Sequence, residues 1–340
     1  MTQQNKQLTN IVITGGCGFI GVNLVRHLLK LEENISIRIV DNFSVGQPED
    51  LEKICTIKRL EADQLNEWQN GVSLVEGDIL DEGLAEKICQ GADGVVHLAA
   101  NTGVIPSIEN PRMDCMVNVL GTFTYLDACR KQSVDRFVLA SSGAPLGEKI
   151  PPIHEEMVTR PISPYGASKL CGEAYCSAFY ASYNLQTVCL RFGNVYGPYS
   201  THKSSVVAKF IKQIISGENL IIYGDGGQTR DFIYIDDLCA AVWASLTAGG
   251  IGGEIFQIAT HKEHTVTEVA GKLNDLALKY LGKSSLVEHE AERKGEVRRN
   301  FSDISKARKM LSWEPKWDFA KGIEKTLKWF LKEADLESQS

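Results

Sequence analysis

The sequence predicts an α/β fold with a doubly wound parallel sheet, and two observations support this prediction. Short β-branched runs alternate with helical stretches along most of the chain, which is typical of a parallel sheet with crossover helices. These runs are apolar on both faces, as are strands that helices cover on both sides. The predicted strands are residues 10–14, 36–41, 72–78, 94–99, 136–141, 187–192 and 254–259.

The alternation changes after residue 193, where loops rich in Gly, Pro and Tyr begin, and helices separated by a basic, polar stretch follow residue 260. This change predicts a smaller, partly interleaved substrate-binding domain. We expect residues 9–193, together with about 232–260, to form the sheet domain. Residues 194–231 and 261–335 would then form the second domain.

Composition narrows the class of protein. A net charge of −7 over 340 residues gives no general attraction to nucleic acid or to an anionic membrane. The N-terminus lacks the apolar stretch of a secretory signal, and no apolar run is long enough to span a bilayer. The cysteines are odd in number and contain no CxxC pair. We therefore expect a cytoplasmic protein with reduced cysteines, no metal site, and no nucleic-acid or membrane partner.

A glycine-rich segment, TGGCGFIG, follows the first predicted strand and opens a helix. Gly15, Gly18 and Gly21 let the backbone turn tightly and approach a pyrophosphate at the helix N-terminus. Asp41 ends the second strand about 20 residues later, where a carboxylate can bind the adenosine ribose. Because Asp41 would repel a 2′-phosphate and Asn42 follows it, the sequence favours NAD over NADP. The alternative is a Gly-rich turn beside an unrelated surface aspartate.

Tyr165 and Lys169 lie one turn apart on a helix predicted over residues 163–183. A neighbouring ammonium group favours the phenolate and would lower the pKa of the tyrosine, so the pair is suited to acid/base chemistry. Ser141 and Ser142 end a predicted strand at the edge where open α/β sheets bind ligands. A hydroxyl there can help a substrate hydroxyl pass its proton to the tyrosine. By itself, the tyrosine–lysine spacing is equally typical of an ordinary helix face.

In this order, the motifs resemble those of the extended short-chain dehydrogenase/reductase family, specifically its nucleotide-sugar epimerases and dehydratases, which have a Rossmann fold. The resemblance covers roughly residues 10–315. The motifs that carry it are TGGCGFIG, HLAA, YGASK, RFGNVYGP, YGDGGQTRDFIYIDDL and RKGEVRRNFSDISKA.

The resemblance implies a set of site residues. The implied catalytic residues are Ser142, Tyr165 and Lys169, where Ser142 is found by counting back from Leu146-Gly147, which stand where the family has Tyr-Gly. The implied NAD-binding residues are Gly15, Gly18, Phe19, Ile20, Gly21, Asp41, Asn42, Asp78, Ile79, Leu98, Ala99, Ala100, Asn118, Tyr165 and Lys169. The implied substrate-binding residues are Ser142, Asn194, Arg230, Arg293 and Asn300. The arginines match those that bind the diphosphate, a role that suits their planar fork.

The resemblance also implies a reaction in which the tyrosine takes the C4 hydroxyl proton and NAD takes the C4 hydride, leaving a 4-keto sugar. Resembling dehydratases carry an acid/base pair, or at least a Glu, directly after the Ser/Thr. Here Gly143 and Ala144 occupy those positions, and neither can transfer a proton. We expect Glu148 and Glu155 to lie on the surface. The sequence therefore favours a UDP-sugar 4-epimerase. The alternatives are a 4,6-dehydratase and a catalytically inactive dinucleotide-binding protein.

Substrate and assembly follow from the same resemblance. Asn300 stands where resembling hexose epimerases have a large aromatic residue, so UDP-GlcNAc/UDP-GalNAc is as plausible a substrate pair as UDP-Glc/UDP-Gal. Helices at about 110–131 and 165–183 match those that resembling proteins pair in a homodimer. The residues that could form that face, or equally the core, are Leu120, Phe123, Tyr125, Leu126, Tyr175, Phe179 and Tyr180. Sugar-nucleotide supply for surface glycans is the implied pathway.

Overall fold

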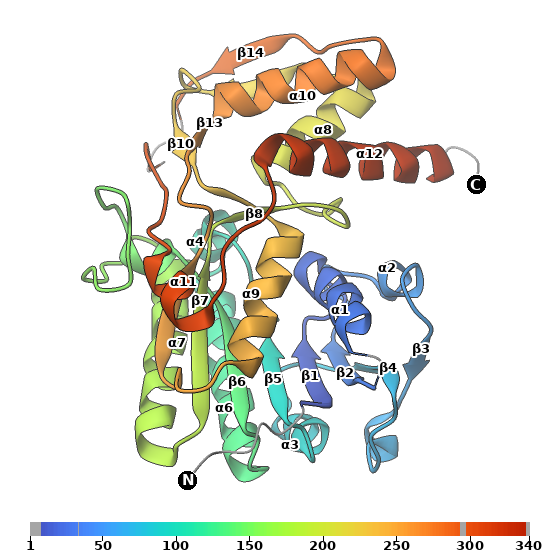
Figure 1. Cartoon of the computed structure of the whole chain (residues 1–340), viewed down its shortest axis with the longest axis vertical. Helices are drawn as coiled ribbons and strands as arrows, with labels where there is room; N and C mark the ends of the chain where they lie inside the picture. The colour runs from blue at the N-terminus through green and yellow to red at the C-terminus, as the bar shows by residue number, and fades with distance from the viewer. Residues whose placement is uncertain (1–7, 33, 293–296, 338–340) are drawn as a thin grey trace.

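An eight-stranded parallel sheet forms the centre of the chain in the computed structural model, which describes residues 8–32, 34–292 and 297–337 (Figure 1). Its strand order is β12-β7-β6-β5-β1-β2-β4-β3. The strands are β1 (Asn10–Thr14), β2 (Ser36–Asp41), β3 (Ile57–Arg59), β4 (Gly71–Glu76), β5 (Gly94–His97), β6 (Arg136–Ser142), β7 (Gln186–Phe192) and β12 (Glu254–Ile258). The α/β prediction is confirmed. The edge strand β3 was not predicted, because it is short and two of its three residues are charged.

Helices cover both faces of this sheet, as a doubly wound fold requires. The helices around the sheet are α1 (Phe19–Leu31), α2 (Pro48–Glu52), α3 (Glu82–Cys89), α4 (Val104–Glu109), α5 (Pro111–Asp114), α6 (Gly121–Lys131), α7 (Pro164–Tyr183) and α9 (Ile235–Thr247). Along β1, Ile11 and Ile13 pack into one buried cluster with α1 and α9, whereas Val12 packs into another with α3, α6 and α7. The alternation shows why these strands are apolar on both faces.

The helix expected over about 110–131 is helical over residues 111–131, with a change of hydrogen-bond pattern inside it. A π-helical segment, η2 (Cys115–Leu120), separates α5 from α6. Such segments are rare and are frequent at functional sites. Here η2 carries Asn118, whose side chain is buried and points to the loop after β5.

A second group of elements lies beyond the carboxyl ends of the strands, at the top of Figure 1. Its elements are β8 (Asn194–Tyr196), α8 (Val206–Ser216), β9 (Leu220–Tyr223), β10 (Thr229–Arg230), β11 (Phe232–Tyr234), β13 (His264–Thr265), α10 (Val266–Leu281), β14 (Val287–Glu290) and α12 (Phe319–Glu337), while α11 (Ser305–Leu311) contacts β12 and α9. Helix α8 lies in a stretch that we interpreted as loops. It forms because its apolar side chains are spaced for one buried face, and Gly217 ends it in the left-handed conformation.

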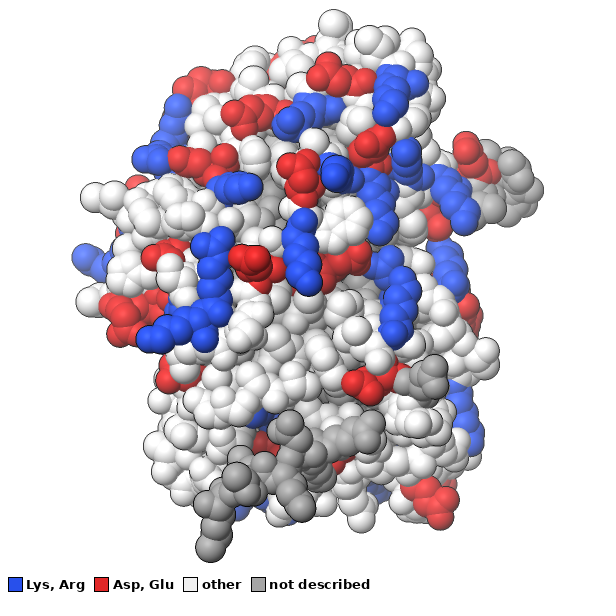
Figure 2. All heavy atoms as spheres, in the orientation of Figure 1, with Lys and Arg blue, Asp and Glu red and all other residues white. Residues whose placement is uncertain are grey.

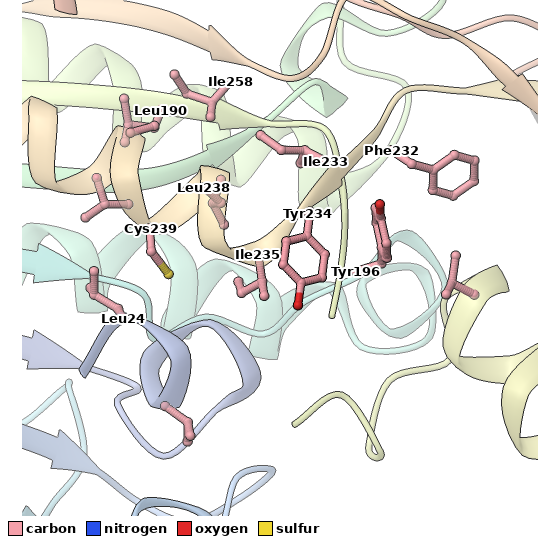
Figure 3. Close-up of a cluster of buried hydrophobic side chains, with 14 of the residues drawn as sticks. Leu24, Leu190, Tyr196, Phe232, Ile233, Tyr234, Ile235, Leu238, Cys239 and Ile258 are labelled. Atoms are coloured by element: carbon pink, nitrogen blue, oxygen red, sulfur yellow. The ribbon is translucent and has the colours of Figure 1, made fainter. Parts of the chain in front are cut away.

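One buried cluster joins the two groups of elements. Tyr196, Phe232 and Tyr234 come from the short parallel pair β8 and β11, and they share the buried cluster of Figure 3 with Leu24 of α1 and Leu190 of β7. The ring centroids of Tyr196 and Tyr234 are 5.5 Å apart and inclined, a favourable aromatic geometry. Continuous apolar packing therefore fixes β8 and β11 against the large sheet.

The surface bears on the predicted partners. On the face drawn in Figure 2, basic and acidic side chains are interspersed rather than gathered by sign. Tyr125 and Leu126 are fully buried, so they belong to the core and not to a dimer face, and Phe179 is also buried. Leu120, Phe123, Tyr175 and Tyr180 are 37–50% exposed. Among the described residues, no helix is long and apolar enough to cross a membrane.

Candidate functional site

The glycine loop between β1 and α1 forms a close backbone turn. Gly15 has a φ of +68°, and a Cβ there would lie 2.8 Å from the backbone of Ala99. A Cβ on Gly21 would lie 2.5 Å from Gly16. The start of α1 can therefore pack against the turn only if residues 15 and 21 are both glycine. Gly18 caps α1 without a side-chain hydrogen bond, and the N–H groups of the first turn, from Phe19 onward, point toward the loop. This arrangement fits a bound pyrophosphate.

Asp41 lies beside this loop at the end of β2. Its carboxylate accepts hydrogen bonds from the backbone N–H groups of Cys17, at 2.9 Å, and Phe43, at 3.0 Å. Burial raises the pKa of Asp41, while these N–H groups oppose the shift. Asn42 donates to Asp78 at 3.2 Å, which brings the segment after β4, with Ile79, to the same edge. The ends of β2 and β4 thus form a polar rim that suits a ribose and a base.

The segment after β5 completes the edge. The hydroxyl of Thr14 accepts from the N–H groups of Leu98 and Ala99, both at 3.1 Å, and so holds the strand end against β1 with Ala100 beyond it. Asn118, on η2, bonds both backbone groups of Asn101, at 2.8 and 3.0 Å. Its amide also donates to Asp114, at 2.9 Å, and to Ser168, at 3.1 Å. The geometry therefore gives Asn118 the task of shaping this edge, because its amide already bonds within the protein.

Ser142, Tyr165 and Lys169 are brought together by β6 and α7. The hydroxyl of Ser142 lies near enough to the phenol of Tyr165 to lower its pKa. Lys169 is 5% exposed and donates to the carbonyl of Ala140 at 2.9 Å, and its Nζ lies 5.9 Å from the centroid of the tyrosine ring. The N-cap Ser163 accepts from the backbone N–H of Gly166 and so fixes the start of α7 directly before the tyrosine. The structure thus joins Ser142 to Tyr165 and Lys169, which the sequence placed in another motif.

Burial shifts the protonation equilibria of Tyr165 and Lys169. It raises the pKa of Tyr165, and Asp114 raises it further, although the neighbouring hydroxyl of Ser142 lowers it. Desolvation of the phenolate is the largest cause in the chain without cofactor, and the expected lowering of the tyrosine pKa in the loaded site stays a prediction. Burial likewise lowers the pKa of Lys169 to about 8, against the effects of Asp114 and Glu173.

Ser141 and Ser142 point to different partners. The hydroxyl of Ser141 donates to Glu173 at 2.6 Å, and Ser141 is 4% exposed. The hydroxyl of Ser142 accepts from the N–H of Ala144 at 3.2 Å and lies near the phenol of Tyr165. The Glu173 contact was missed in the sequence, although its position one turn after Lys169 on the same helix was a usable signal.

The loop after Ser142 contains a short 3-10 turn, Ala144–Leu146, in which Pro145 and Leu146 are buried. Gly147 has a φ of +67°, and a Cβ there would lie 2.1 Å from the carbonyl of Arg160. Glu148 is exposed, as predicted. Glu155 is partly buried rather than on the surface, since its carboxylate accepts from the backbone N–H of Gln257 at 2.6 Å. Neither glutamate bonds to Ser142 in the described structure.

Two of the predicted substrate residues, Asn194 and Arg230, lie at the ends of short strands. Asn194, at the start of β8, pairs with the backbone of Asp231 through its N–H, at 2.8 Å. Arg230 donates through Nη1 to the carbonyls of Thr229 and Val297, both at 2.7 Å. Asn300 precedes Phe301, whose carbonyl accepts from the N–H of Ile153. Arg293 lies outside the described residues.

Comparison with known proteins places this geometry in context. A sequence model of the NAD dependent epimerase/dehydratase family matches residues 11–259. A UDP-glucose 4-epimerase of Mycolicibacterium smegmatis is 33% identical over 94% of this chain and 97% of its own length. A dTDP-glucose 4,6-dehydratase of Streptomyces antibioticus is 32% identical over 94% of this chain and 92% of its own length. A solved UDP-N-acetylglucosamine 4-epimerase of Methanobrevibacter ruminantium M1, in complex with UDP-N-acetylmuramic acid, covers 96% of this chain and 100% of its own at 30% identity, with a TM-score of 0.85.

Proposed function

The chain belongs to the NAD-dependent epimerase/dehydratase family, and from that premise we propose that it is an NAD-dependent UDP-sugar 4-epimerase. The observation that carries the proposal is the juxtaposition of Ser142 and Tyr165 beside Lys169, with Gly143 and Ala144 directly after the serine. The pair and the ammonium group provide acid/base chemistry at one substrate hydroxyl. The two small residues provide no second acid or base.

The proposed mechanism uses each side chain for one task. Tyr165 takes the proton of the sugar C4 hydroxyl, and Ser142, beside the tyrosine, orients that hydroxyl. Lys169 stabilises the phenolate through its charge. NAD, when bound at the glycine turn and the polar rim, would supply a reversible hydride acceptor for C4. Tyr165 then gives its proton back to the C4 oxygen, which completes the inversion.

The cofactor would be held by the backbone turn and the polar rim. Gly15, Gly18 and Gly21, with the N–H groups of Phe19 and Ile20, face the pyrophosphate. At the ribose and base, the proposed contacts are Asp41, Asn42, Asp78 and Ile79. The nicotinamide side would be lined by Leu98, Ala99, Ala100, Tyr165 and Lys169, with Asn118 shaping the edge.

The reaction can be tested directly. Purified protein is incubated with NAD and with UDP-GlcNAc or UDP-Glc, and the products are identified by NMR. We expect the C4 epimer of one substrate pair. A 4-keto-6-deoxy product would show the dehydratase reaction instead, with an acid and base from outside the segment after Ser142. No turnover by wild-type protein with any nucleotide sugar would favour a catalytically inactive dinucleotide-binding protein.

The sugar and nucleotide are part of the proposal. We infer a UDP-sugar, bound by Asn194, Arg230 and Arg293, with Asn300 beside C2. The small side chain of Asn300 supports an N-acetylated substrate, and the solved relative with bound UDP-N-acetylmuramic acid supports the same class. In the Asn300→Tyr variant we expect turnover of UDP-GlcNAc to fall roughly tenfold or more relative to that of UDP-Glc. An unchanged ratio of the two rates would contradict this role.

We also propose a homodimer through α6 and α7. Phe123 and Tyr175 meet edge to face, with ring centroids 5.4 Å apart, and remain 39% exposed. Leu120, which ends η2 directly before α6, and Tyr180 of α7 are also exposed, and an apolar face of this kind is typical of a two-fold interface. Light scattering is expected to give twice the mass of one chain. A monomer at all accessible concentrations would contradict the proposal.

A further inference from the structure

A buried ion pair lies behind the proposed catalytic residues, between α7 and β7. The carboxylate of Glu173 accepts from Nε of Arg191 at 2.8 Å and from Nη2 at 2.7 Å. Both side chains are only 2% exposed. The hydroxyl of Ser141, on β6, donates to the same carboxylate at 2.6 Å. Three elements of the fold therefore meet at a single charged group.

Each member of this network is close in sequence to a residue with a proposed task. Ser141 directly precedes Ser142. Glu173 follows Lys169 by one turn of α7, so the two lie on the same side of the helix. Arg191 ends the stretch of β7 that leads into Asn194. A change in the network would thus shift several proposed site residues relative to one another.

We propose that Glu173 is a positioning residue, which with Arg191 and Ser141 locks α7 against β6 and β7 so that Tyr165 and Lys169 face Ser142. The inference rests on the proposed function of those three residues. It adds a residue that touches neither substrate nor cofactor and acts through the lysine.

Glu173 acts on Lys169 through its charge as well as through its position. Burial lowers the pKa of Lys169, and the opposing charges come from Asp114 on α5 and Glu173 on α7. Cys189 on β7 is a neutral thiol, because a hydrogen bond with Cys176 and burial raise its pKa. From β5, His97 also faces the lysine, but burial lowers the pKa of this histidine to about 3, so it is neutral. Two carboxylates therefore keep the ammonium group charged, and Glu173 is the one that is fixed by a bidentate partner.

A purely structural role explains this pair less well. Burying two charges costs much of what their attraction returns, so apolar residues of similar size often serve a core equally well. Moreover, Nη1 of Arg191 is buried without a hydrogen-bond partner among the described residues, so the cation is incompletely compensated even with Glu173 present. Electrostatic stabilisation of the Lys169 ammonium group accounts for the buried carboxylate of Glu173, whereas packing alone does not.

The test is a titration of the Lys169 side chain by NMR on isotope-labelled protein, with Lys169→Arg to assign the signal. In Glu173→Gln we expect the pKa of Lys169 to fall by about one pH unit or more, because one stabilising charge is lost and Arg191 is left uncompensated. The alkaline limit of turnover should move to lower pH by the same amount. If Glu173→Gln does not fold, Glu173→Gln combined with Arg191→Gln removes both charges and should shift the pKa in the same direction.

Asp237→Asn is the matched control. Asp237 is a buried carboxylate on α9 that accepts from the N–H groups of Lys316 and Trp317, both at 2.9 Å, away from the lysine. This variant should lower Tm and leave the Lys169 titration unchanged.

Two outcomes separate the proposals. A Lys169 titration that is identical in wild type and in the Glu173 variants, whatever their Tm, would overturn the positioning role. If the titration shifts as expected but wild-type protein converts no nucleotide sugar, the positioning role stands and the proposed function fails.

Discussion

The two halves of the candidate site are built in different ways. At the cofactor edge, the geometry is set by the backbone: glycines between β1 and α1 leave space that no side chain could share, and Asp41 bonds main-chain N–H groups. At the catalytic edge, the geometry is set by side chains that bond one another across β6, α7 and β7. A backbone-defined site tolerates few residue types, whereas a side-chain network depends on several partners at once. Substitutions in the two halves should therefore differ in how they change NAD affinity, turnover and stability.

The largest effect is expected at the catalytic edge. Tyr165→Phe removes the group that takes the C4 proton, and turnover should fall by about 10²–10⁴-fold. NAD binding, measured by calorimetry, should change little because the cofactor edge is intact. Turnover close to that of wild type would show that another residue takes the proton.

At the cofactor edge, Gly21→Val places a side chain where even a Cβ would lie 2.5 Å from Gly16. Either the turn or the first turn of α1 must shift, so NAD affinity should fall about tenfold or more, and stability by about 1–3 kcal/mol. Calorimetry with NAD measures the first change and denaturant unfolding the second. Gly271→Val, at a helical glycine where a Cβ would meet no atom within 4 Å, is the control for the loss of glycine itself.

The paired serines sharpen the comparison within the catalytic edge. Ser141→Ala removes a buried donor to Glu173 and should lower the free energy of unfolding by about 1–3 kcal/mol. Ser142→Ala, at a partly exposed position, should cost less stability and more turnover. Thermal unfolding and steady-state kinetics on the same two variants separate the effects, and the reverse pattern would mean that Ser141 is the catalytic hydroxyl.

Compared with these substitutions, a change of pH near neutrality should have the smallest effect on turnover and stability. The pKa of Lys169 is about 8, below its ordinary value of 10.5, so the ammonium group is lost as the pH rises through about 8. Turnover should then fall by about tenfold per pH unit. The effect on stability has the opposite sign, because the folded state binds this proton less tightly than the unfolded chain does. The free-energy cost of burying the charged lysine disappears as the pH rises from about 8 to 10.5, so the free energy of unfolding increases over this range. Rate profiles and unfolding curves across this range test both signs.

The cofactor edge could be predicted in detail because the signals are local. The glycine spacing and Asp41 follow one another along the chain, and the strands that position them are apolar on both faces. The features that the sequence could not predict depend on contacts between distant segments. The pKa of Tyr165 is set by burial under the folded chain, and the burial of Tyr125 and Leu126 by the packing of α6 on the sheet. The helix expected over about 110–131 is helical over 111–131, but the sequence did not predict the π-helical turn at η2, where Asn118 bonds the loop after β5. The periodicity of a sequence does not show which distant residue a side chain will contact.

The position of β12 has a consequence for the synthesis of the chain. This strand comes from residues 254–258, yet it covers the outer edge of β7 through pairs such as Phe256 with Leu190. While the chain emerges from the ribosome, β7 is complete more than sixty residues earlier. Its edge must stay unpaired until β12 arrives, and an open apolar edge is where nascent chains associate. A chain truncated between β11 and β12 should therefore aggregate, even though it contains every proposed catalytic residue.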